Sequence, residues 1–385
     1  MKDEKDFYYD EVFKEYKKRG DITEIGKSLG KGAYGIVKDV RVKNKTYAGK
    51  LLVKDTLGDL VLSQELRGPN IIKIIKICSP VVKYGNTYHL IIMEKAILRD
   101  LGKLNNFFHE RNLLKLIYQK CFDEELADTV LRYFVRQIIN GFETLEKNNY
   151  AHFDIKPENI LITVNLILKI SDFSMLKKLE DKSKDVNDYK IPGGTTGYLS
   201  PEYYLKEKVT ADNAKKQDYF SLGCMIFLLK YGFGLLKFKT IDDKTIIADT
   251  IVSLLMRNTN YIFSQKLTDK DLITFLTNLV HIKPDYRYNI GEIHRNKWLN
   301  KNLEYIEKTV DDFETDEEKL LLELQKQDFL IQKKEIFEIN KMNDEHVSNI
   351  KKETNKKIKR KIGKCFKFKK CKYDIKKTND EEGNK

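Results

Sequence analysis

Two segments near the amino terminus carry groups that could handle phosphate. The first, Gly30-Lys31-Gly32-Ala33-Tyr34-Gly35-Ile36-Val37, lies between two predicted strands, and its missing side chains would let backbone N–H groups approach phosphates closely. Fifteen residues after Gly35, the strand-like segment Tyr47-Ala48-Gly49-Lys50 offers an ammonium group that could reach two phosphates. Such glycine patterns also occur in ordinary turns, and strand lysines are usually solvated, so neither segment alone identifies a site.

Further polar segments follow in a fixed order along the chain. His152-Phe153-Asp154-Ile155-Lys156-Pro157-Glu158-Asn159 comes directly after a predicted long helix, and Asp172-Phe173-Ser174 comes next. The later landmarks are Gly194–Glu202 (GTTGYLSPE), Asp218–Gly223 (DYFSLG) and Pro284–Arg287 (PDYR) with Trp298. Together with the glycine-rich segment and Lys50, this ordered series resembles the protein kinase family over about 280 residues.

The resemblance implies an α+β fold with two lobes, a small antiparallel β-rich N-lobe and a larger, mostly helical C-lobe. The implied reaction is transfer of the γ-phosphate of ATP to a serine or threonine hydroxyl of a protein substrate. Lys156-Pro157-Glu158-Asn159 and Gly194-Thr195 resemble the Ser/Thr-directed form of these loops. The alternative is a pseudokinase, a scaffold that binds nucleotide without transferring phosphate. A small-molecule phosphotransferase fits less well, because Thr195–Glu202 resembles a platform for docking peptide.

The roles that the resemblance implies follow from what phosphoryl transfer requires. Asp154 would accept or orient the proton of the substrate hydroxyl, and Lys156 would steady the transferring group. Asn159 and Asp172 would supply oxygen ligands to Mg²⁺, with Mn²⁺ as an alternative metal. Thr195 would contact both Asp154 and Lys156. The implied catalytic set is Asp154, Lys156, Lys50 and Thr195.

The same resemblance places the nucleotide. The backbone of Glu94 and Ala96 would bind adenine, while Met93, also a core residue, would narrow the rear of the pocket. Asp100 would hold the ribose. The implied nucleotide-binding set is Gly30, Lys31, Gly32, Ala33, Tyr34, Gly35, Val37, Ala48, Lys50, Met93, Glu94, Ala96, Asp100, Asn159 and Asp172.

Three other residues match positions of the family outside the catalytic set. Glu202 and Arg287 correspond to an ion pair that braces the substrate-binding lobe, and loss of one partner would leave a buried charge. Glu158 stands where relatives directed to basic substrates contact a basic residue upstream of the target. Glutamate is also frequent there in other members, so this role is only one of two interpretations.

The chain departs from the family pattern at three positions. Counting back from Gly68-Pro69-Asn70, Asp59 stands where a glutamate normally pairs with Lys50, and the nine-residue interval requires a short helix. Phe153 replaces an arginine that balances an activation-loop phosphate in regulated relatives, which predicts activity that depends little on that phosphorylation. Ser174 replaces a glycine, and its Cβ penalises positive φ. Asp59, Ser174 and the short helix are the case for a pseudokinase.

The elements expected to position these residues show two periods. From Ile22 to Met93, short apolar runs predict antiparallel strands, with a hairpin over 71–93 whose turn is Gly85-Asn86. From Asp128 onward, apolar residues recur at helical spacing. Residues 105–126 are interpreted as an insertion before that helix. The residues at helical spacing are Leu131, Phe134, Ile138, Phe142 and Leu145.

The predicted organisation has four parts. Residues 1–20 are an N-terminal extension, and 21–300 are the catalytic domain, with the N-lobe at about 21–95 and the C-lobe at about 96–300. Residues 301–350 are a helical extension whose segment 316–350 carries one apolar stripe with a seven-residue repeat. This stripe could form a coiled coil with a second copy, dock on the catalytic domain, or remain a single solvated helix. Residues 351–385 are predicted to be a disordered basic tail.

The positive charge of the chain is concentrated in this tail. From Lys351 to Lys372, twelve basic residues and one acid give +11 of the formal net charge of +13, which leaves +2 for the rest. The tail could bind an anionic membrane, nucleic acid or an import receptor, and Cys365 and Cys371 could carry a lipid. A solvated tail without a partner is the alternative.

The sequence also predicts where the protein resides. Its five cysteines lack paired metal-ligand spacing, which favours a reduced intracellular compartment. The amino terminus MKDEKDFYYD is too charged for a secretory signal, and no run approaches the roughly 18 apolar residues of a membrane helix. We therefore expect a soluble, cytoplasmic protein that is not secreted, with a nuclear or membrane-associated location as alternatives.

Overall fold

The computed structural model describes residues 4–32, 35–53, 61–96, 100–102, 124–163, 167–179, 189–231, 235 and 269–301. All of them belong to the first of two units into which the chain divides, Met1–Glu317. Several predictions lie outside the described residues. These concern Ala33, Tyr34, Asp59, residues 105–123 of the interpreted insertion, the stripe of 316–350 and the tail of 351–385.

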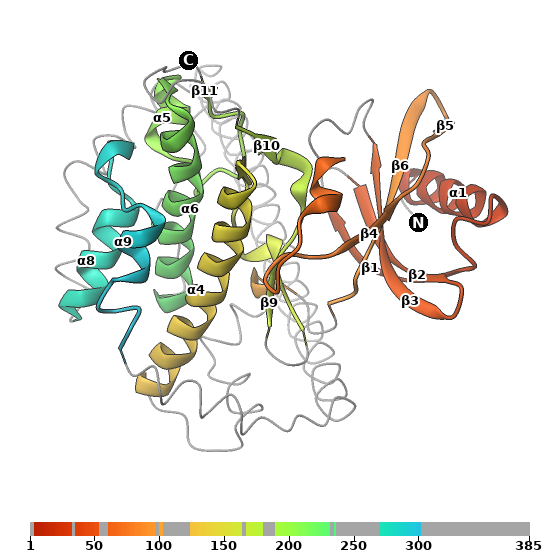
Figure 1. Ribbon diagram of the computed structural model, residues 1–385. Coiled ribbons are helices and arrows are strands. Elements are labelled where there is room, and N and C mark those ends of the chain that lie inside the picture. Colours follow the sequence, from red (N-terminus) through yellow and green to blue (C-terminus); the bar gives the residue numbers. More distant parts are fainter. Residues whose placement is uncertain are drawn as a thin grey trace, which may run out of the picture. The chain divides into compact units, whose positions relative to one another are not determined.

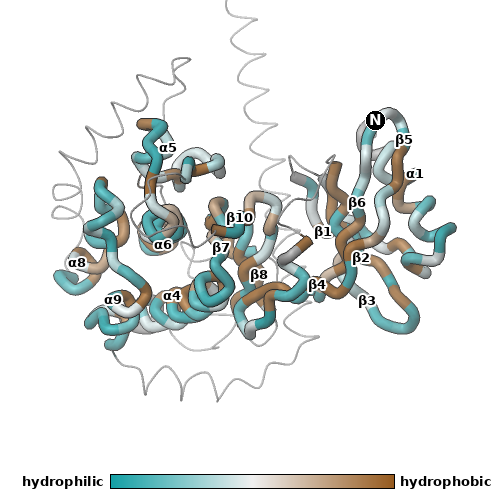
Figure 2. The backbone as a smooth tube through the Cα atoms, turned by 45° about the horizontal axis from the view of Figure 1, so that its top comes forward, coloured by the Kyte–Doolittle hydropathy of each residue, from teal (hydrophilic) through white to brown (hydrophobic). Residues whose placement is uncertain are grey.

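An antiparallel sheet forms the N-lobe, which confirms the predicted fold class for this part (Figure 1). The strands lie in the order β1-β2-β3-β6-β4, and β5 also pairs with β6. Six consecutive residues of β6 are buried, and because side chains alternate along a strand, this means that both faces of the sheet are covered there. Hydrophobic stretches run along the strands of the sheet (Figure 2). The strands are β1 (Glu24–Gly32), β2 (Gly35–Val42), β3 (Lys45–Val53), β4 (Ile74–Ile77), β5 (Val81–Lys83) and β6 (Asn86–Met93).

The predicted hairpin is present, but its turn lies one residue earlier than expected. Lys83 pairs with Asn86, so the two turn residues are Tyr84 and Gly85 rather than Gly85 and Asn86. Both have positive φ, 52° and 72°, as a tight hairpin turn requires. The Asn86 side chain donates a hydrogen bond to the Tyr84 carbonyl at 3.1 Å, which stabilises the tyrosine in this conformation.

Helix α1 (Glu4–Lys18) covers one face of this sheet, within the segment that was predicted only as an extension. Val12, Phe13 and Tyr16 are fully buried against apolar residues of β2, β3 and β6. The Tyr16 hydroxyl donates to the Tyr88 carbonyl at 2.7 Å and accepts from the Leu90 N–H at 3.2 Å. It thereby supplies hydrogen bonds to β6 at the junction between its pairing with β5, which ends at Tyr88, and its pairing with β4, which begins at Ile91.

Helices dominate the C-lobe, as predicted, and α6 lies between α4 and α8 (Figure 1). The apolar residues predicted at helical spacing all lie in α4 and are buried. This helix begins at Glu124, so the last three residues of the interpreted insertion belong to it. The helices are α4 (Glu124–Lys147), α5 (Pro201–Leu205), α6 (Ala211–Tyr231), α8 (Lys270–Leu279) and α9 (Ile290–His294). No helix among the described residues is long and apolar enough to cross a lipid bilayer.

Short pairs of strands hold the loops that connect these helices. β7 pairs with β10, β8 with β9, and β11 with β12, all antiparallel. The strands are β7 (Tyr150–Ala151), β8 (Ile160–Ile162), β9 (Leu168–Ile170), β10 (Lys177–Lys178), β11 (Tyr189–Lys190) and β12 (Lys208–Val209).

Residues 70–72, which precede β4, bond directly to β9. The Ile72 N–H donates to the Ile170 carbonyl and the Ile170 N–H donates to the Asn70 carbonyl, both at 2.9 Å. The Asn70 side chain donates to the Leu168 carbonyl at 2.9 Å and to Gln137 of α4 at 3.0 Å. A Cβ at Gly141 of α4 would lie 3.1 Å from the Asn70 carbonyl oxygen, so glycine permits this close packing. An N-lobe segment is therefore joined to the C-lobe through its backbone.

Candidate active site

Asp154, Lys156 and Thr195 form a closed triangle of polar contacts. The Lys156 ammonium lies 3.0 Å from the Asp154 carboxylate and donates to the Thr195 hydroxyl at 2.6 Å. That hydroxyl in turn donates to Asp154 at 2.7 Å. The contacts predicted for Thr195 are therefore present, between loops that lie about forty residues apart. An acceptor oxygen, a cation and a hydroxyl converge at one point.

Asn159 is fixed beside this triangle by the short 3-10 turn Pro157–Asn159. Its side-chain amide donates to the Asp154 carboxylate at 3.0 Å and to the Asp154 carbonyl at 2.7 Å. Because both bonds use the amide nitrogen, the amide oxygen points away from Asp154. This orientation suits the predicted role of Asn159 as an oxygen ligand to a metal.

Helix α6 holds the loop that carries Asp154. The Asp218 carboxylate accepts from the backbone N–H of His152 at 2.7 Å and of Phe153 at 2.9 Å. Burial raises the pKa of Asp218 to about 7, although the two N–H donors act in the opposite direction. Phe153 has φ 64°, a left-handed conformation that is unfavourable for a bulky residue. These buried bonds therefore maintain a strained turn immediately before Asp154.

His152 links the same loop to the segment that follows β9. Its Nε2 is bonded to the Ser171 carbonyl at 2.8 Å, and its Nδ1 accepts from the Asp154 N–H at 3.2 Å. Burial lowers the pKa of this imidazole, which favours the neutral ring with the proton on Nε2. The Asp154 and Asp172 loops are thus held together by a fully buried side chain.

Two cations keep the candidate catalytic acids ionised. Burial would raise the pKa of Asp154, but the Thr195 hydroxyl and the Lys156 ammonium lower it below the ordinary value. Burial acts in the same way on Asp172, where the Lys50 ammonium and the Ser174 N–H lower the pKa to about 2. Both carboxylates therefore carry a full charge at neutral pH, as a metal ligand or a hydroxyl acceptor requires.

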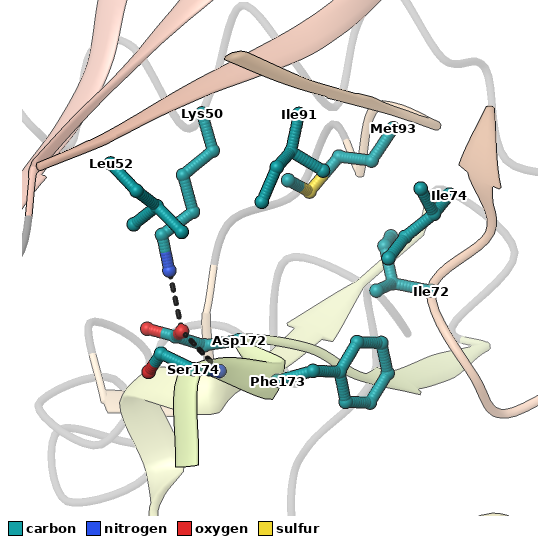
Figure 3. Close-up of a pocket in the computed structure, with 9 residues that line it drawn as sticks. All are labelled: Lys50, Leu52, Ile72, Ile74, Ile91, Met93, Asp172, Phe173 and Ser174. Carbon is teal, nitrogen blue, oxygen red and sulfur yellow. Dashed lines mark hydrogen bonds and ion pairs between the residues drawn. The ribbon is translucent and has the colours of Figure 1, made fainter. Parts of the chain in front are cut away.

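Lys50 of β3 lies 2.5 Å from the Asp172 carboxylate (Figure 3). Asp172 itself has positive φ, 61°, and its side chain accepts from the Ser174 N–H at 3.3 Å. Ser174 lies inside the 3-10 turn Phe173–Met175, so the steric cost predicted for its Cβ does not arise here. The predicted pairing of Lys50 with Asp59 concerns a residue outside the described part of the chain.

A mainly apolar pocket lies behind Lys50 and Asp172, with Phe173 across from the two charges (Figure 3). Met93, the last residue of β6, lines it, and its role at the rear of an adenine pocket stays a prediction. The lining residues are Lys50, Leu52, Ile72, Ile74, Ile91, Met93, Asp172, Phe173 and Ser174.

The glycine-rich segment forms the end of β1 and the start of β2, where Gly32 pairs with Gly35. A Cβ at Gly35 would lie 1.8 Å from the Leu51 carbonyl oxygen of β3, so no larger residue fits this position. A Cβ at Gly30 would meet no atom within 4 Å, which leaves open space beside the backbone. Val37 pairs with Lys50, and the described part of the segment thus lies next to the strand lysine.

The segment after β6 presents a limited set of backbone groups. The Glu94 N–H donates to the Lys73 carbonyl at 2.9 Å, so Glu94 can offer its carbonyl oxygen, but not this N–H, to a purine. Its carboxylate accepts from the Lys73 N–H at 2.7 Å and pairs with Lys169 of β9 at 2.9 Å. Asp100 lies further along and forms an isolated bridge with Leu161 of β8.

The predicted ion pair between Glu202 and Arg287 is present and buried. Two parallel hydrogen bonds of 2.8 and 2.7 Å join the side chains, which are 1% and 0% exposed. Arg287 also donates to the carbonyls of His281 at 2.7 Å and Ile282 at 3.1 Å. The remaining donors of the guanidinium are thereby largely satisfied, which a buried charge requires.

Sequence comparison identifies the family to which these features belong. A family model described as protein kinase domain matches residues 23–299, more than half of the chain. The chain belongs to the protein kinase family. The match begins after helix α1, so the helix that covers the N-lobe sheet precedes the matched part of the kinase domain.

Individual kinases show the same relationship at low identity. Human NUAK family SNF1-like kinase 1 is 27% identical over 289 residues, covering 72% of this chain and 38% of that protein. The 3-phosphoinositide-dependent protein kinase B of Dictyostelium discoideum is 30% identical over 302 residues, covering 74% of this chain and 29% of that protein. The CBL-interacting serine/threonine-protein kinase 12 of Arabidopsis thaliana is 25% identical over 304 residues, covering 75% of this chain and 55% of that protein. The chain thus spans between about a third and about half of these kinases.

The support that α6 gives to the catalytic loop of this kinase domain was not predicted from the sequence. Asp218 was named only as the first residue of the landmark Asp218–Gly223, and its bonds to residues 152–153 were not expected. The available signal was an acid at the start of the apolar segment 219–229, because a buried acid needs hydrogen-bond donors.

Proposed function

We propose that this protein kinase transfers the γ-phosphate of ATP to serine and threonine hydroxyls of protein substrates. The observation that carries the proposal is the contact triangle of Asp154, Lys156 and Thr195. A substrate hydroxyl bound next to Asp154 would meet an ionised acceptor, and the incoming phosphoryl group would meet the Lys156 ammonium. This arrangement suits a reaction that depends on positioning and charge neutralisation.

The remaining charged groups fit the nucleotide. Lys50 can pair with phosphate oxygens, and its present partner Asp172 has oxygens that can bind a divalent cation together with Asn159. Two protein oxygen ligands, completed by phosphate and water, suit Mg²⁺, with Mn²⁺ as the alternative. When bound, the metal offsets the charge of the phosphate oxygens. We assign Gly30, Gly32, Gly35, Val37 and Ala48 to the walls that enclose the nucleotide.

The Ser/Thr preference is supported by the resemblance of Lys156-Pro157-Glu158-Asn159 and Gly194-Thr195 to Ser/Thr-directed loops, and the Thr195 hydroxyl bonds to both Asp154 and Lys156. Glu158 is exposed nearby and could pair with a basic residue of the substrate. A library of Ser-, Thr- and Tyr-containing peptides incubated with Mg-ATP tests both assignments. Incorporation into tyrosine peptides alone would overturn the acceptor type.

The central experiment compares the intact protein with Asp154→Asn and Lys50→Met in a phosphate-incorporation assay. We expect either substitution to lower kcat by at least about 100-fold, and Asp154→Asn to unfold at a temperature close to wild type. Thr196→Ala changes an exposed neighbour of Thr195 and is the control, with turnover within about twofold of wild type. Equal incorporation by wild type and Asp154→Asn would exclude catalysis and favour a nucleotide-binding scaffold.

A further inference from the structure

The two faces of strand β2 have different partners. Ile36 and Val40 pack into the cluster beneath α1, and Lys38 between them pairs with Asp10 of that helix. Because side chains alternate along a strand, Val37 and Asp39 lie on the opposite face. That face also carries Lys50, which pairs with Val37 in the sheet. An acid of β2 therefore lies on the side to which the proposed function assigns the nucleotide.

Asp39 reaches the segment that follows β6. Its carboxylate lies 2.8 Å from the ammonium of Lys95, and the two side chains are 15% and 26% exposed. β3 separates β2 from β6 in the sheet, so this ion pair connects segments that share no backbone hydrogen bonds. On β3 the residue opposite both Asp39 and Met93 is Ala48, whose small side chain leaves room on this face.

The neighbouring strand β1 also leaves space for this acid. A Cβ at Gly26 would lie 2.7 Å from the Cβ of Asp39, a distance that side chains do not tolerate. Gly26 precedes the glycine-rich segment and is separate from it. The absence of a side chain at this position is explained by the place that Asp39 occupies.

Lys95 stands between Glu94 and Ala96, and Glu94 is anchored on a different element. The Glu94 carboxylate pairs with Lys169 of β9 at 2.9 Å, and Lys169 donates to the Pro69 carbonyl at 3.1 Å. Two successive residues of the segment are thus held by ion pairs, one to β9 and one to β2. The segment cannot shift relative to β2 without breaking the pair at Asp39.

We infer that Asp39 is a positioning residue for the nucleotide. By holding Lys95, it fixes the distance between the backbone groups of Glu94–Ala96 and the glycine-rich ends of β1 and β2. A nucleotide would contact these two regions with its base and its phosphates respectively, so their separation determines how well both ends bind at once. This inference rests on the proposed function, because it takes the nucleotide site from that proposal.

The test measures Mg-ATP affinity by calorimetry, together with KM for ATP and kcat, on the intact chain. We expect Asp39→Asn and Lys95→Met each to weaken ATP binding and raise KM about 5- to 10-fold, with kcat within about twofold. The double variant is expected to be no worse than the single ones, since the two residues act as a pair. Exchange of the charges, Asp39→Lys with Lys95→Asp, is expected to recover at least half of the lost affinity.

A second ion pair on the same strands provides the matched control. Glu24 of β1 and Arg41 of β2 lie 3.0 Å apart but are 58% and 47% exposed. Glu24→Gln and Arg41→Gln are expected to leave ATP affinity unchanged, because exposed pairs contribute little. Unchanged affinity in Asp39→Asn and Lys95→Met, or a lower unfolding temperature as their only effect, would overturn the role of Asp39. Absence of ATP binding by wild type would overturn the nucleotide site itself, and binding without phosphate transfer would overturn only the catalytic proposal.

Discussion

The ion pair between Asp172 and Lys50 affects both the charge of a candidate metal ligand and the stability of the fold. Its carboxylate has a pKa of about 2 because Lys50 and the Ser174 N–H outweigh the effect of burial. The ordinary value is 3.8, so the unfolded chain takes up this proton at a higher pH than the folded chain. The ionised form therefore stabilises the fold above about pH 4, and this contribution is lost as the pH falls from about 4 to about 2.

We expect this titration to contribute about 2 kcal/mol to the free energy of unfolding. Between pH 5 and pH 2, wild type should lose about that much more stability than Asp172→Asn, which cannot titrate at this position. Urea unfolding followed at pH steps through this range measures the difference. Lys50→Met is also expected to lose less stability than wild type in this window, because it removes the cation that lowers the Asp172 pKa, and parallel pH profiles for wild type and both variants would contradict the assignment.

At the scale of elements, α1 completes the N-lobe by covering the face of the sheet opposite the candidate active site. Tyr16 is its most specific contact, because one hydroxyl satisfies a carbonyl and an N–H of β6. Burial also raises the pKa of this phenol to about 12, so it remains protonated and able to donate. The helix should therefore be retained when the catalytic domain is isolated.

We expect Tyr16→Phe to lower the free energy of unfolding by about 1 to 2 kcal/mol, since it leaves two backbone groups of β6 without this partner. Denaturant unfolding measures the change. Tyr8→Phe on the same helix, where the ring lies beside Tyr84, is the control and is expected to remain within about 0.5 kcal/mol. Removal of residues 1–20 should lower stability further than Tyr16→Phe, and equal stability would show that α1 is dispensable.

The described ends of the segment between Asp172 and Glu202, residues 172–179 and 189–202, are held by apolar packing and by strand pairing. Phe153 is 2% exposed and belongs to a cluster with Leu179, Ile191 and Val209. In the first end, β10 pairs with β7, and in the second end, β11 pairs with β12. Phe153, which stands where regulated relatives have an arginine, therefore contributes hydrophobic contacts to this packing.

We expect phosphatase treatment to leave more than half of the turnover, because the contacts around Phe153 need no phosphate. Phe153→Leu is expected to keep kcat within about threefold. Phe153→Arg is expected to lower it at least about tenfold, since the guanidinium would be buried among apolar side chains. Phosphate-incorporation assays on treated and untreated protein measure these effects, and complete loss of activity after phosphatase treatment would contradict the prediction.

At the scale of the whole molecule, the tail carries most of the net positive charge, and the rest of the chain carries little. The +11 carried by residues 351–372 predicts binding of the tail to anionic surfaces. We expect the full chain to bind phosphatidylserine vesicles at low salt and to be released at high salt, and a chain ending at residue 350 to remain unbound in both. Duplex nucleic acid is the second arm of this comparison. Failure to bind either surface would indicate a solvated tail.

The order of motifs was sufficient to predict the fold class and the convergence of Asp154, Lys156 and Thr195. These residues lie in short motifs whose residue types and spacing resemble those of the kinase family, so their contacts could be anticipated from sequence. Glu202 and Arg287 were predicted for the same reason. The roles of these residues in catalysis stay predictions until the variants are assayed.

Contacts between distant side chains without a motif were not predictable in this way. Helix α1 has apolar residues at Val12, Phe13 and Tyr16, but nothing local indicates that the sheet is their partner. The pairing of Asp39 with Lys95 depends on the register of three strands, and a lone acid in a strand does not reveal that register. The hairpin turn was misplaced by one residue because both Gly85 and Asn86 favour turns, and only strand pairing distinguishes the two.

The backbone bonds between residues 70–72 and β9 limit how the nucleotide cleft can open. A rotation of the N-lobe sheet that displaced this segment would have to break the hydrogen bonds at Asn70 and Ile72, whereas a rotation about the segment itself leaves them intact. A rotation that keeps these bonds therefore has its axis close to Ile71. The rear wall at Ile72 would then move little during each opening, while the parts of the sheet further from this axis would move more.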